Sequence, residues 1–186
     1  MASASLTSVQ VGSPSNQHWD MQKVLRDEYT GDVHISTGMT TKEEVEKIVQ
    51  FWETGKGNAK ERLVLYNCTS GYPVPFPDVC LLELRELHTK YADRVKYLGF
   101  SGHHLGIAID VAAYAMGATW NERHFTKDRT WKGTDHAASL EPAGMTKLCR
   151  DLKATWQCMT LKSTDILPIE AEQRAKLKWG CYNVKK

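Results

Sequence analysis

Residues 96–125 constrain the fold of this chain more than any other segment, because they predict two strands with a helix between them. The segment begins with a short apolar run that ends in polar residues. Its middle is Ala-rich, apolar nearly all round, and stopped by Gly117. An apolar helix between two short strands is typical of a parallel βαβ unit. The segment therefore predicts an α/β fold with parallel strands.

The same segment carries a histidine at or near the C-terminal end of each strand, His103 and His124. Neighbouring strands lie about 4.8 Å apart, and parallel α/β folds place their sites at the C-terminal ends of strands. A single histidine at a strand end is usually a solvated loop residue. Two at equivalent positions of consecutive strands indicate a shared site for one metal ion.

Strands and helices also alternate along the rest of the chain. The capping-box pattern at residues 41–44 marks one helix start, residues 126–140 predict a polar loop, and residues 162–186 predict a linker or tail. At 186 residues, a single domain is expected. Strands are predicted to start near residues 9, 33, 64, 97 and 119, and helices to run over 16–28, 41–52, 78–91, 105–117 and 142–157.

The composition excludes several classes of function. A net charge of +2 without a dominant basic patch does not indicate nucleic-acid binding. No apolar run approaches the ~20 residues of a membrane span, and the first residues lack the features of a signal peptide. The cysteines form no CxxC motif and are odd in number, so we expect free thiols in a reducing, cytoplasmic compartment. They are Cys68, Cys80, Cys149, Cys158 and Cys181.

Four successive predicted strands end in a serine with a glycine beside it. Turn chemistry alone explains any one such serine. Four in register, on the same edge as the two histidines, instead indicate a site for phosphate or another polyoxygen anion, because hydroxyls and open backbone amides bind such groups. The four are Ser13, Ser36, Ser70 and Ser101.

Five segments give the chain a close resemblance to the sialic acid synthase (N-acetylneuraminate synthase) family. They occur in the family's order and spacing, and the resemblance runs from about residue 9 to about residue 178. It implies condensation of phosphoenolpyruvate with an N-acetylmannosamine-type sugar and release of phosphate, in carbohydrate biosynthesis. The segments are ISTGM at 35–39, CTSGYP at 68–73, GFSGH at 99–103, ERHFT at 122–126 and WKGTDHAASLEP at 131–142.

The resemblance also implies a fold. Family members have a (β/α)8 TIM barrel followed by a small antifreeze-like domain; here residues 9–13 match the fourth barrel strand and 121–125 the eighth. Residues 1–161 are thus expected to form a partial barrel of strands 4 to 8 with their helices, and 162–186 a linker or basic C-terminal tail. Strands one to three have no counterpart, so we expect a homo-oligomer or a barrel-completing partner, because open sheet edges promote association.

Site roles follow from the resemblance position by position. His103 and His124 match the residues that bind a divalent metal, Mn²⁺ or Mg²⁺. The remaining matches are phosphate contacts of phosphoenolpyruvate at Ser13, Ser36 and Ser101, a polar phosphate-site position at Ser70, and sugar contacts at Tyr72, Glu122 and Asp135. Of these, Glu122 and Asp135 are the catalytic candidates, able to bind sugar hydroxyls or move a proton.

Two positions depart from the family pattern. Gln10 stands where members usually have lysine, and Ser15 where they usually have an acid. The loss of that cation and of three strands favours a second hypothesis, a non-catalytic remnant or a regulatory partner chain that binds an anion or metal. The intact Ser, His, Glu and Asp set favours the enzyme. A third hypothesis is a synthase for a related sugar such as legionaminate.

Overall fold

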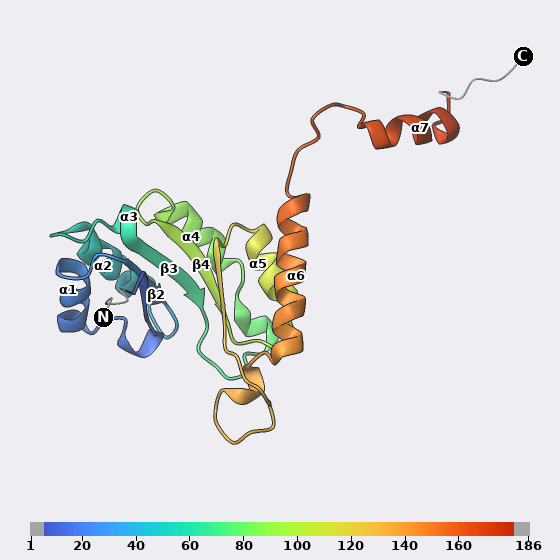
Figure 1. Cartoon of the computed structure of the whole chain (residues 1–186). Coiled ribbons are helices and arrows are strands. Elements are labelled where there is room, and N and C mark those ends of the chain that lie inside the picture. Colours follow the sequence, from blue (N-terminus) through green and yellow to red (C-terminus); the bar gives the residue numbers. More distant parts are fainter. Residues whose placement is uncertain (1–5, 181–186) are drawn as a thin grey trace, which may run out of the picture.

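A computed structural model of the chain describes residues 6–180, which contain one parallel sheet of five strands (Figure 1). The strands lie in the sheet in the order of the sequence, so each one pairs with its sequence neighbours. The predicted α/β class and the five predicted strands are confirmed. The strands are β1 Ser8–Val11, β2 Asp32–Ser36, β3 Leu63–Cys68, β4 Tyr97–Gly102 and β5 Trp120–Arg123.

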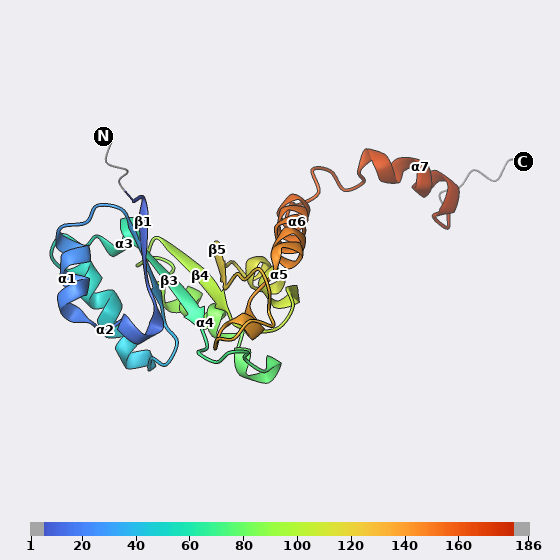
Figure 2. The ribbon, with the colours of Figure 1, turned by 60° about the horizontal axis from the view of Figure 1, so that its bottom comes forward.

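The sheet is curled (Figure 2), and side chains of its two outermost strands meet on the inner side of the curl. Gln10 of β1 donates from Nε2 to Oε2 of Glu122 on β5 at 2.5 Å, although three strands separate β1 from β5 in the sheet. The fold is therefore a curled half-barrel. We call the face that carries Gln10 and Glu122 the concave face, and the opposite one the outer face.

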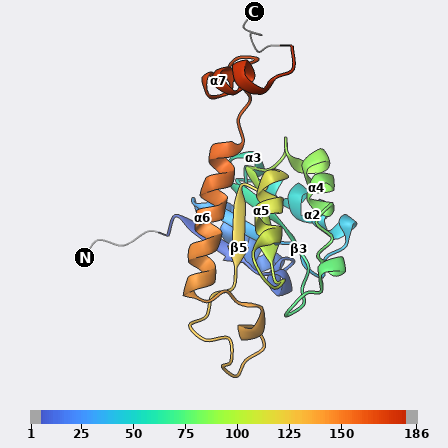
Figure 3. The same ribbon diagram turned by 90° about the vertical axis from the view of Figure 1, so that its right-hand side faces the viewer.

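Helices connect the strands and cover the outer face (Figures 1 and 3). Such crossovers are required because parallel neighbours cannot be joined by tight turns. α5 packs on β4 and β5, and α6 packs on α5 (Figure 3). The helices are α1 Trp19–Asp27, α2 Lys42–Glu53, α3 Ala59–Arg62, α4 Glu83–Tyr91, α5 Ala108–Ala115, α6 Pro142–Cys158 and α7 Pro168–Leu177.

The apolar core lies between the outer face of the sheet and these helices. Side chains alternate between the two faces of a strand, and Ile35, Leu65 and Phe100 point outward, each at most 2% exposed. Trp52 of α2 is fully buried against them, and its indole nitrogen donates to Gln22 of α1 at 2.8 Å. Because the main core sits behind the sheet, the concave face can carry polar side chains such as Gln10 and Glu122.

The helix predicted over 16–28 begins later than expected, and Asn16, the first residue of the predicted range, does not cap it. α1 starts at Trp19, and the ring of His18 accepts a hydrogen bond at its N-terminus. Asn16 is buried, and its amide donates to the Ser36 carbonyl at 2.9 Å and to Thr40 Oγ1 at 2.7 Å. Its side chain joins two loops at the C-terminal end of the sheet, which makes it unavailable as a cap.

The helix predicted from Asp78 also starts later. Residues Phe76–Val79 form a 3-10 turn, and α4 begins at Glu83. The helix in segment 105–117 is confirmed but shorter at both ends, at Ala108–Ala115. The capping box of α2 is confirmed, with Thr41 and Glu44 bonded reciprocally.

Within the segment predicted as linker or tail, Pro168–Leu177 forms a helix that the sequence reading did not anticipate, α7. All three views place it away from the sheet and its covering helices (Figures 1–3). Residues 181–186 lie outside the described part of the chain. Among residues 6–180, none of the helices has the length and apolar character that crossing a bilayer requires.

An ion-pair network between α2 and the turn that follows α4 generates a prediction about acid stability. Arg94 contacts Glu46 at 2.9 Å and Glu53 at 2.7 Å, and its hydrogen bonds lower the pKa of Glu46 from 4.5 to about 2. A lowered folded-state pKa stabilises the fold above pH 4.5, and this contribution is lost as pH falls toward 2. Replacing Glu46 by glutamine should therefore cost about 1 kcal/mol near pH 7, since solvent screens the pair, and progressively less below pH 4.5.

Denaturant unfolding of wild type and Glu46→Gln at pH 7, 4 and 2.5 measures this. Glu172→Gln, which removes an exposed pair with Lys176 in α7, is the control and should change little at any pH. A deficit for Glu46→Gln that stays constant from pH 7 to 2.5 would contradict the assignment.

Candidate functional site

Polar side chains collect on the concave face at the carboxyl ends of the strands. The register sets this arrangement, because residues paired across parallel strands point to the same face. Ser36 pairs with Tyr66, Cys68 pairs with Ser101, and Ser101 pairs with Glu122. Four neighbouring strands, β2 to β5, thus bring hydroxyl, thiol and carboxyl groups to one edge, where the sequence predicted a site.

His103 and His124, which follow β4 and β5 at this edge, are brought together as predicted. Their ring centroids are 5.0 Å apart and the rings are nearly perpendicular, at 87°. The Tyr72 ring lies over both, with centroid distances of 4.5 and 5.6 Å. His103 Nδ1 is 2.8 Å from the Thr69 carbonyl; since a carbonyl only accepts, Nδ1 carries the proton and Nε2 has the free lone pair. This is the form in which imidazole binds metals.

The donor set therefore fits a divalent metal only in part. Two imidazoles face each other, and the Asp135 carboxylate lies 3.5 Å from His124 Nδ1. Within residues 6–180, no group of three or more His, Cys, Asp or Glu side chains is arranged to hold a metal ion. The chain offers a pair of nitrogen ligands that leaves coordination positions open for substrate or water.

Cys68, the last residue of β3, lies among the residues of the site and was expected from the sequence only to be a free thiol. Burial by itself raises the pKa of its thiol, but hydrogen bonds with His103 and Ser101 lower that pKa below the ordinary value. Correspondingly, burial opposes protonation of His103, while Cys68 and the Thr69 carbonyl raise the pKa of its ring overall. The two side chains thus form one coupled polar pair below the rim.

The four predicted serines all reach this region. Ser13 Oγ lies 3.7 Å from Cys68 Sγ, and an added Cβ at Gly38 would meet both Ser13 Oγ and Ser70 Oγ. Ser70 Oγ is buried without a partner among the described residues, so it has hydrogen-bonding capacity to offer. Ser36 and Ser101 are 4% and 3% exposed. The hydroxyls of Ser13 and Ser70 therefore approach Gly38 so closely that a side chain at position 38 would displace them.

The two predicted catalytic carboxylates occupy different settings. Glu122 on β5 accepts the hydrogen bond from Gln10 described above. Asp135 belongs to the 126–140 loop, which returns to the sheet through hydrogen bonds between Thr126 and Leu140 (3.0 Å) and between Leu140 and His124 (2.8 Å). These backbone bonds fix the loop so that Asp135 lies beside the histidine pair.

A second layer of side chains fills the concave face below the site. His34 Nδ1 lies 2.8 Å from the Tyr66 hydroxyl, and Trp120 meets the His34 ring edge-on at 4.9 Å. Burial lowers the pKa of His34. Gly99 is required opposite Tyr66, because a Cβ there would approach the Tyr66 ring to 2.6 Å. This layer supports the floor of the site and was not predicted from the sequence.

Behind the histidine pair lies a buried charge cluster that was also not predicted from the sequence. Asp110 of α5 contacts Arg123 at 2.6 Å and His104 at 3.2 Å, with all three side chains at most 1% exposed. Arg123 also donates to the carbonyls of His104 (2.7 Å) and Gly106 (2.8 Å). One sequence feature could have indicated this cluster: a single acidic residue, Asp110, within the apolar helix predicted over 105–117. His104 and Arg123 point outward, so their neighbours His103 and His124 point to the concave face.

The fold and this polar edge define the class: an α/β half-barrel with a binding site at the carboxyl ends of its strands. The sequence matches the NeuB family over residues 1–164, and the chain belongs to that family. Family members include sialic acid synthase-type enzymes, as the similar proteins below illustrate. The resemblance expected from the sequence is thereby confirmed.

Two curated relatives and one solved structure illustrate the similarity. N-acetylneuraminate-9-phosphate synthase of Homo sapiens is 37% identical over 143 residues, which cover 77% of this chain and 38% of the relative. N,N'-diacetyllegionaminic acid synthase of Campylobacter jejuni is 36% identical over 125 residues, covering 67% of this chain and 36% of the relative. The chain therefore spans less than half the length of either relative.

Among solved structures, N-acetylneuraminic acid synthetase from Leptospira borgpetersenii, in complex with citrate, matches with a TM-score of 0.77 and 25% identity. The match covers 94% of this chain and 59% of that one. The similarity supports the half-barrel description, because almost the whole described fold finds a counterpart there.

The buried cluster makes a testable prediction about stability. Removing one partner of a buried ion pair leaves an uncompensated charge and typically costs about 3–5 kcal/mol. Asp110→Asn keeps the side-chain shape but strands Arg123, so we expect a loss in that range by urea unfolding. Asp32→Asn breaks the half-exposed pair with Lys96 (2.7 Å) at the other end of the sheet, and should cost no more than about 1 kcal/mol. Equal losses of unfolding free energy in the two variants would show that burial does not make the Asp110–Arg123 pair more important for stability than a surface pair.

Proposed function

We propose that this chain supplies the catalytic half of a nonulosonic acid synthase, which condenses phosphoenolpyruvate with an N-acetylmannosamine-type sugar and releases phosphate. The observation that carries the proposal is the juxtaposition of the His103–His124 pair with buried hydroxyls and Glu122 on one concave face. Membership of the NeuB family and relatives that make sialic and legionaminic acids support it. The described cysteines are all free, consistent with a reducing cytoplasm.

We further propose that β1 to β5 correspond to strands four to eight of a TIM barrel. Two observations support this assignment. The strands run in sequence order, as consecutive barrel strands do, and β1 and β5 are edges of a curled sheet. A curled parallel sheet normally closes into a barrel and so has no exposed edge strands. We therefore propose that a second copy of the chain or a barrel-completing chain pairs with β1 and β5.

The residues have distinct roles in the proposed reaction. The hydroxyls of Ser13, Ser36, Ser70 and Ser101 bind the phosphate of phosphoenolpyruvate through charge-assisted hydrogen bonds. Tyr72 stands over the histidine pair, where it can close one side of the sugar site. Glu122 and Asp135 orient sugar hydroxyls or move a proton. The enol carbon then bonds to the sugar aldehyde carbon, water adds to the resulting cation, and phosphate leaves.

His103 and His124 would hold a divalent metal in this scheme, with neutral imidazoles favouring Mn²⁺ over Mg²⁺. When bound, such an ion supplies Lewis-acid polarisation of the aldehyde oxygen. The protein's own contribution is orientation. The Thr69 carbonyl fixes the tautomer of His103, and the Asp110–Arg123 pair holds the residues beside both histidines.

A second candidate function is a non-catalytic partner chain that binds an anion or metal. Gln10 favours it, because its uncharged amide engages the Glu122 carboxylate where the family pattern has a cation. One missing charged donor can cost a factor of roughly 10²–10³ in rate. The choice of sugar also stays open between sialic and legionaminic precursors, since both kinds of synthase are similar to this chain.

We predict that His103 and His124 jointly bind one Mn²⁺ ion. The physical reason is that two imidazoles on one ion chelate it, so losing either should weaken binding at least tenfold. Calorimetry with Mn²⁺ on wild type, His103→Ala and His124→Ala measures this. His88→Ala is the control, because His88 lies on α4 and contacts Gly117, outside the site. Undiminished affinity in either site variant contradicts a shared ion.

Activity is tested by phosphate release from phosphoenolpyruvate with N-acetylmannosamine and Mn²⁺. The chain alone should self-associate and turn over poorly, because its sheet edges and concave face are open. Adding the barrel segment of the human relative that precedes the matched region should restore sugar-dependent release, and Glu122→Gln should abolish it. No sugar-dependent release in any mixture would favour the non-catalytic partner; a monodisperse, fully active monomer would show that five strands suffice.

A further inference from the structure

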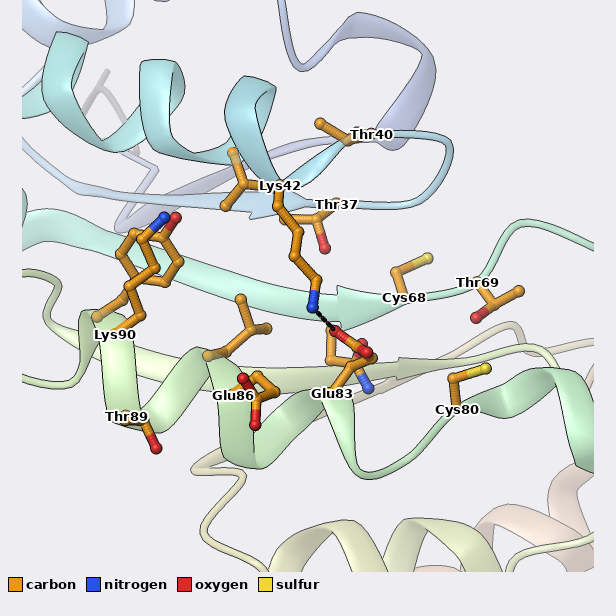
Figure 4. A pocket seen from close by; sticks show the side chains of 14 residues that line it. Thr37, Thr40, Lys42, Cys68, Thr69, Cys80, Glu83, Glu86, Thr89 and Lys90 are labelled. Carbon is orange, nitrogen blue, oxygen red and sulfur yellow. Dashed lines mark ion pairs between the residues drawn. The ribbon is translucent and has the colours of Figure 1, made fainter.

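The helices that cover the sheet are held to one another, whereas α7 stands apart. In the lining of the cavity between α2 and α4, Lys42 and Glu83 point toward each other and pair at 3.4 Å (Figure 4). α7 instead lies away from the sheet and its covering helices in every view (Figures 1–3). Its length is 10 residues, and isolated helices shorter than roughly 12–15 residues are only marginally stable in water. Packing against a partner would therefore stabilise α7.

An exposed apolar stripe runs along one face of α7. Ile169, Gln173 and Leu177 follow one another at intervals of four residues, which places them on the same side of the helix. Ile166, just before the helix, lines the same groove as these three residues. Ile166, Ile169 and Leu177 are 41%, 81% and 73% exposed, so covering them with another apolar surface is favourable. The opposite face carries small side chains such as Ala171.

The charges beside the stripe are divided along the helix. The acids Glu170 and Glu172 lie in its first half, and two bases lie in its second half. Glu170 and Arg174, four residues apart, flank one side of the stripe, and Glu172 and Lys176 flank the other side. Within the chain, Glu172 pairs with Lys176, and Glu170 pairs with Lys162 at 2.8 Å. Such exposed pairs contribute only about 0–1 kcal/mol, so these charges stay available to a partner.

This division of charge favours a second copy of α7 in antiparallel orientation. In an antiparallel pair related by a two-fold axis, each flank faces the same flank of the other copy in the reverse direction. Glu170 then lies beside the partner's Arg174, and Glu172 lies beside the partner's Lys176. A parallel pair would instead set acids against acids and bases against bases, and like charges in contact disfavour an interface.

Gln173 lies at the centre of this arrangement, midway between Ile169 and Leu177. In the antiparallel pair, Ile169 packs against the partner's Leu177, and the two Gln173 side chains meet near the two-fold axis. A side-chain amide both donates and accepts, so two glutamines can hydrogen bond to each other. A polar residue within an apolar helix pair specifies its register, and Gln173 has that position here.

We propose that the apolar stripe of α7 is a self-association surface, on which a second copy of the chain docks its own α7 antiparallel about Gln173. The interface is small, so the pairing alone is weak. It lies outside the concave face and the strands β1 and β5. The proposal therefore rests neither on the proposed synthase reaction nor on pairing of sheet edges.

Disulfide formation by Gln173→Cys in the full chain tests the register. The two substituted positions meet at the two-fold axis, so they should form a disulfide between chains. Ala171→Cys is the matched control, because Ala171 lies on the opposite face of the same helix. Under a mild oxidant, mass-spectrometric peptide mapping should show the 173–173 disulfide forming roughly tenfold faster than the 171–171 disulfide, because pairing raises the effective concentration of the two thiols.

Exchange of charges tests what selects the partner. Within Gln173→Cys, the pair of changes Glu170→Lys and Glu172→Lys makes both flanks of α7 basic. The pair Arg174→Glu and Lys176→Glu makes both flanks acidic. Either variant alone should lose the faster 173–173 disulfide, because like charges then face each other. An equimolar mixture of the two should regain it, which also shows that neither variant has lost the helix.

Equal rates at positions 171 and 173 would overturn the proposal, and sheet-edge pairing alone would give that result. A mixture of the two charge variants that stays unlinked would also overturn it. So would a disulfide from position 173 to Cys149 or Cys158 in preference to the 173–173 disulfide, because α7 would then pack against α6 rather than against a second α7.

Discussion

The site depends on one constraint, the alternation of side chains at the ends of β4 and β5. His104 and Arg123 point outward and meet Asp110 in a cluster that excludes water almost completely. Because adjacent residues of a strand point to opposite faces, His103 and His124 must then point to the concave face, where their rings lie 5.0 Å apart. A buried charge cluster in the outer layer thus determines the geometry of a polar pair in the inner layer.

The curl of the sheet brings the remaining residues of the site together. An open, flat sheet would leave Gln10 and Glu122 far apart, but here the two outermost strands approach closely enough for a hydrogen bond of 2.5 Å. The curl also gathers Ser13, Ser70 and Cys68 around Gly38. The same half-barrel leaves β1 and β5 as the outermost strands of the described sheet, so the polar concave face and the proposed barrel-completing partner have a common structural origin.

The features that depend on the periodicity of apolar residues, the strands and the fold class, could be predicted from the sequence. The apolar runs around Ile35, Leu65 and Phe100 located the strands, and the order of strands and helices identified the class. The residues brought together by tertiary structure were harder to predict. The interaction of Gln10 with Glu122 spans 112 positions, and local patterns carry no information about it. Asp110 in an apolar helix was a visible signal, but its partners follow from packing alone. Asn16, where a helix was predicted to begin, is instead a buried link between loops.

Anomalous diffraction at the manganese edge, from crystals of the full chain grown with Mn²⁺, tests the central claim most directly. The account predicts one strong peak on the concave face, within bonding distance of His103 Nε2 and of a His124 ring nitrogen, with the Asp110–Arg123 pair intact behind it. A peak that contacts only one of the two histidines, or that lies at another surface, would contradict the claim that strand alternation builds a shared metal site.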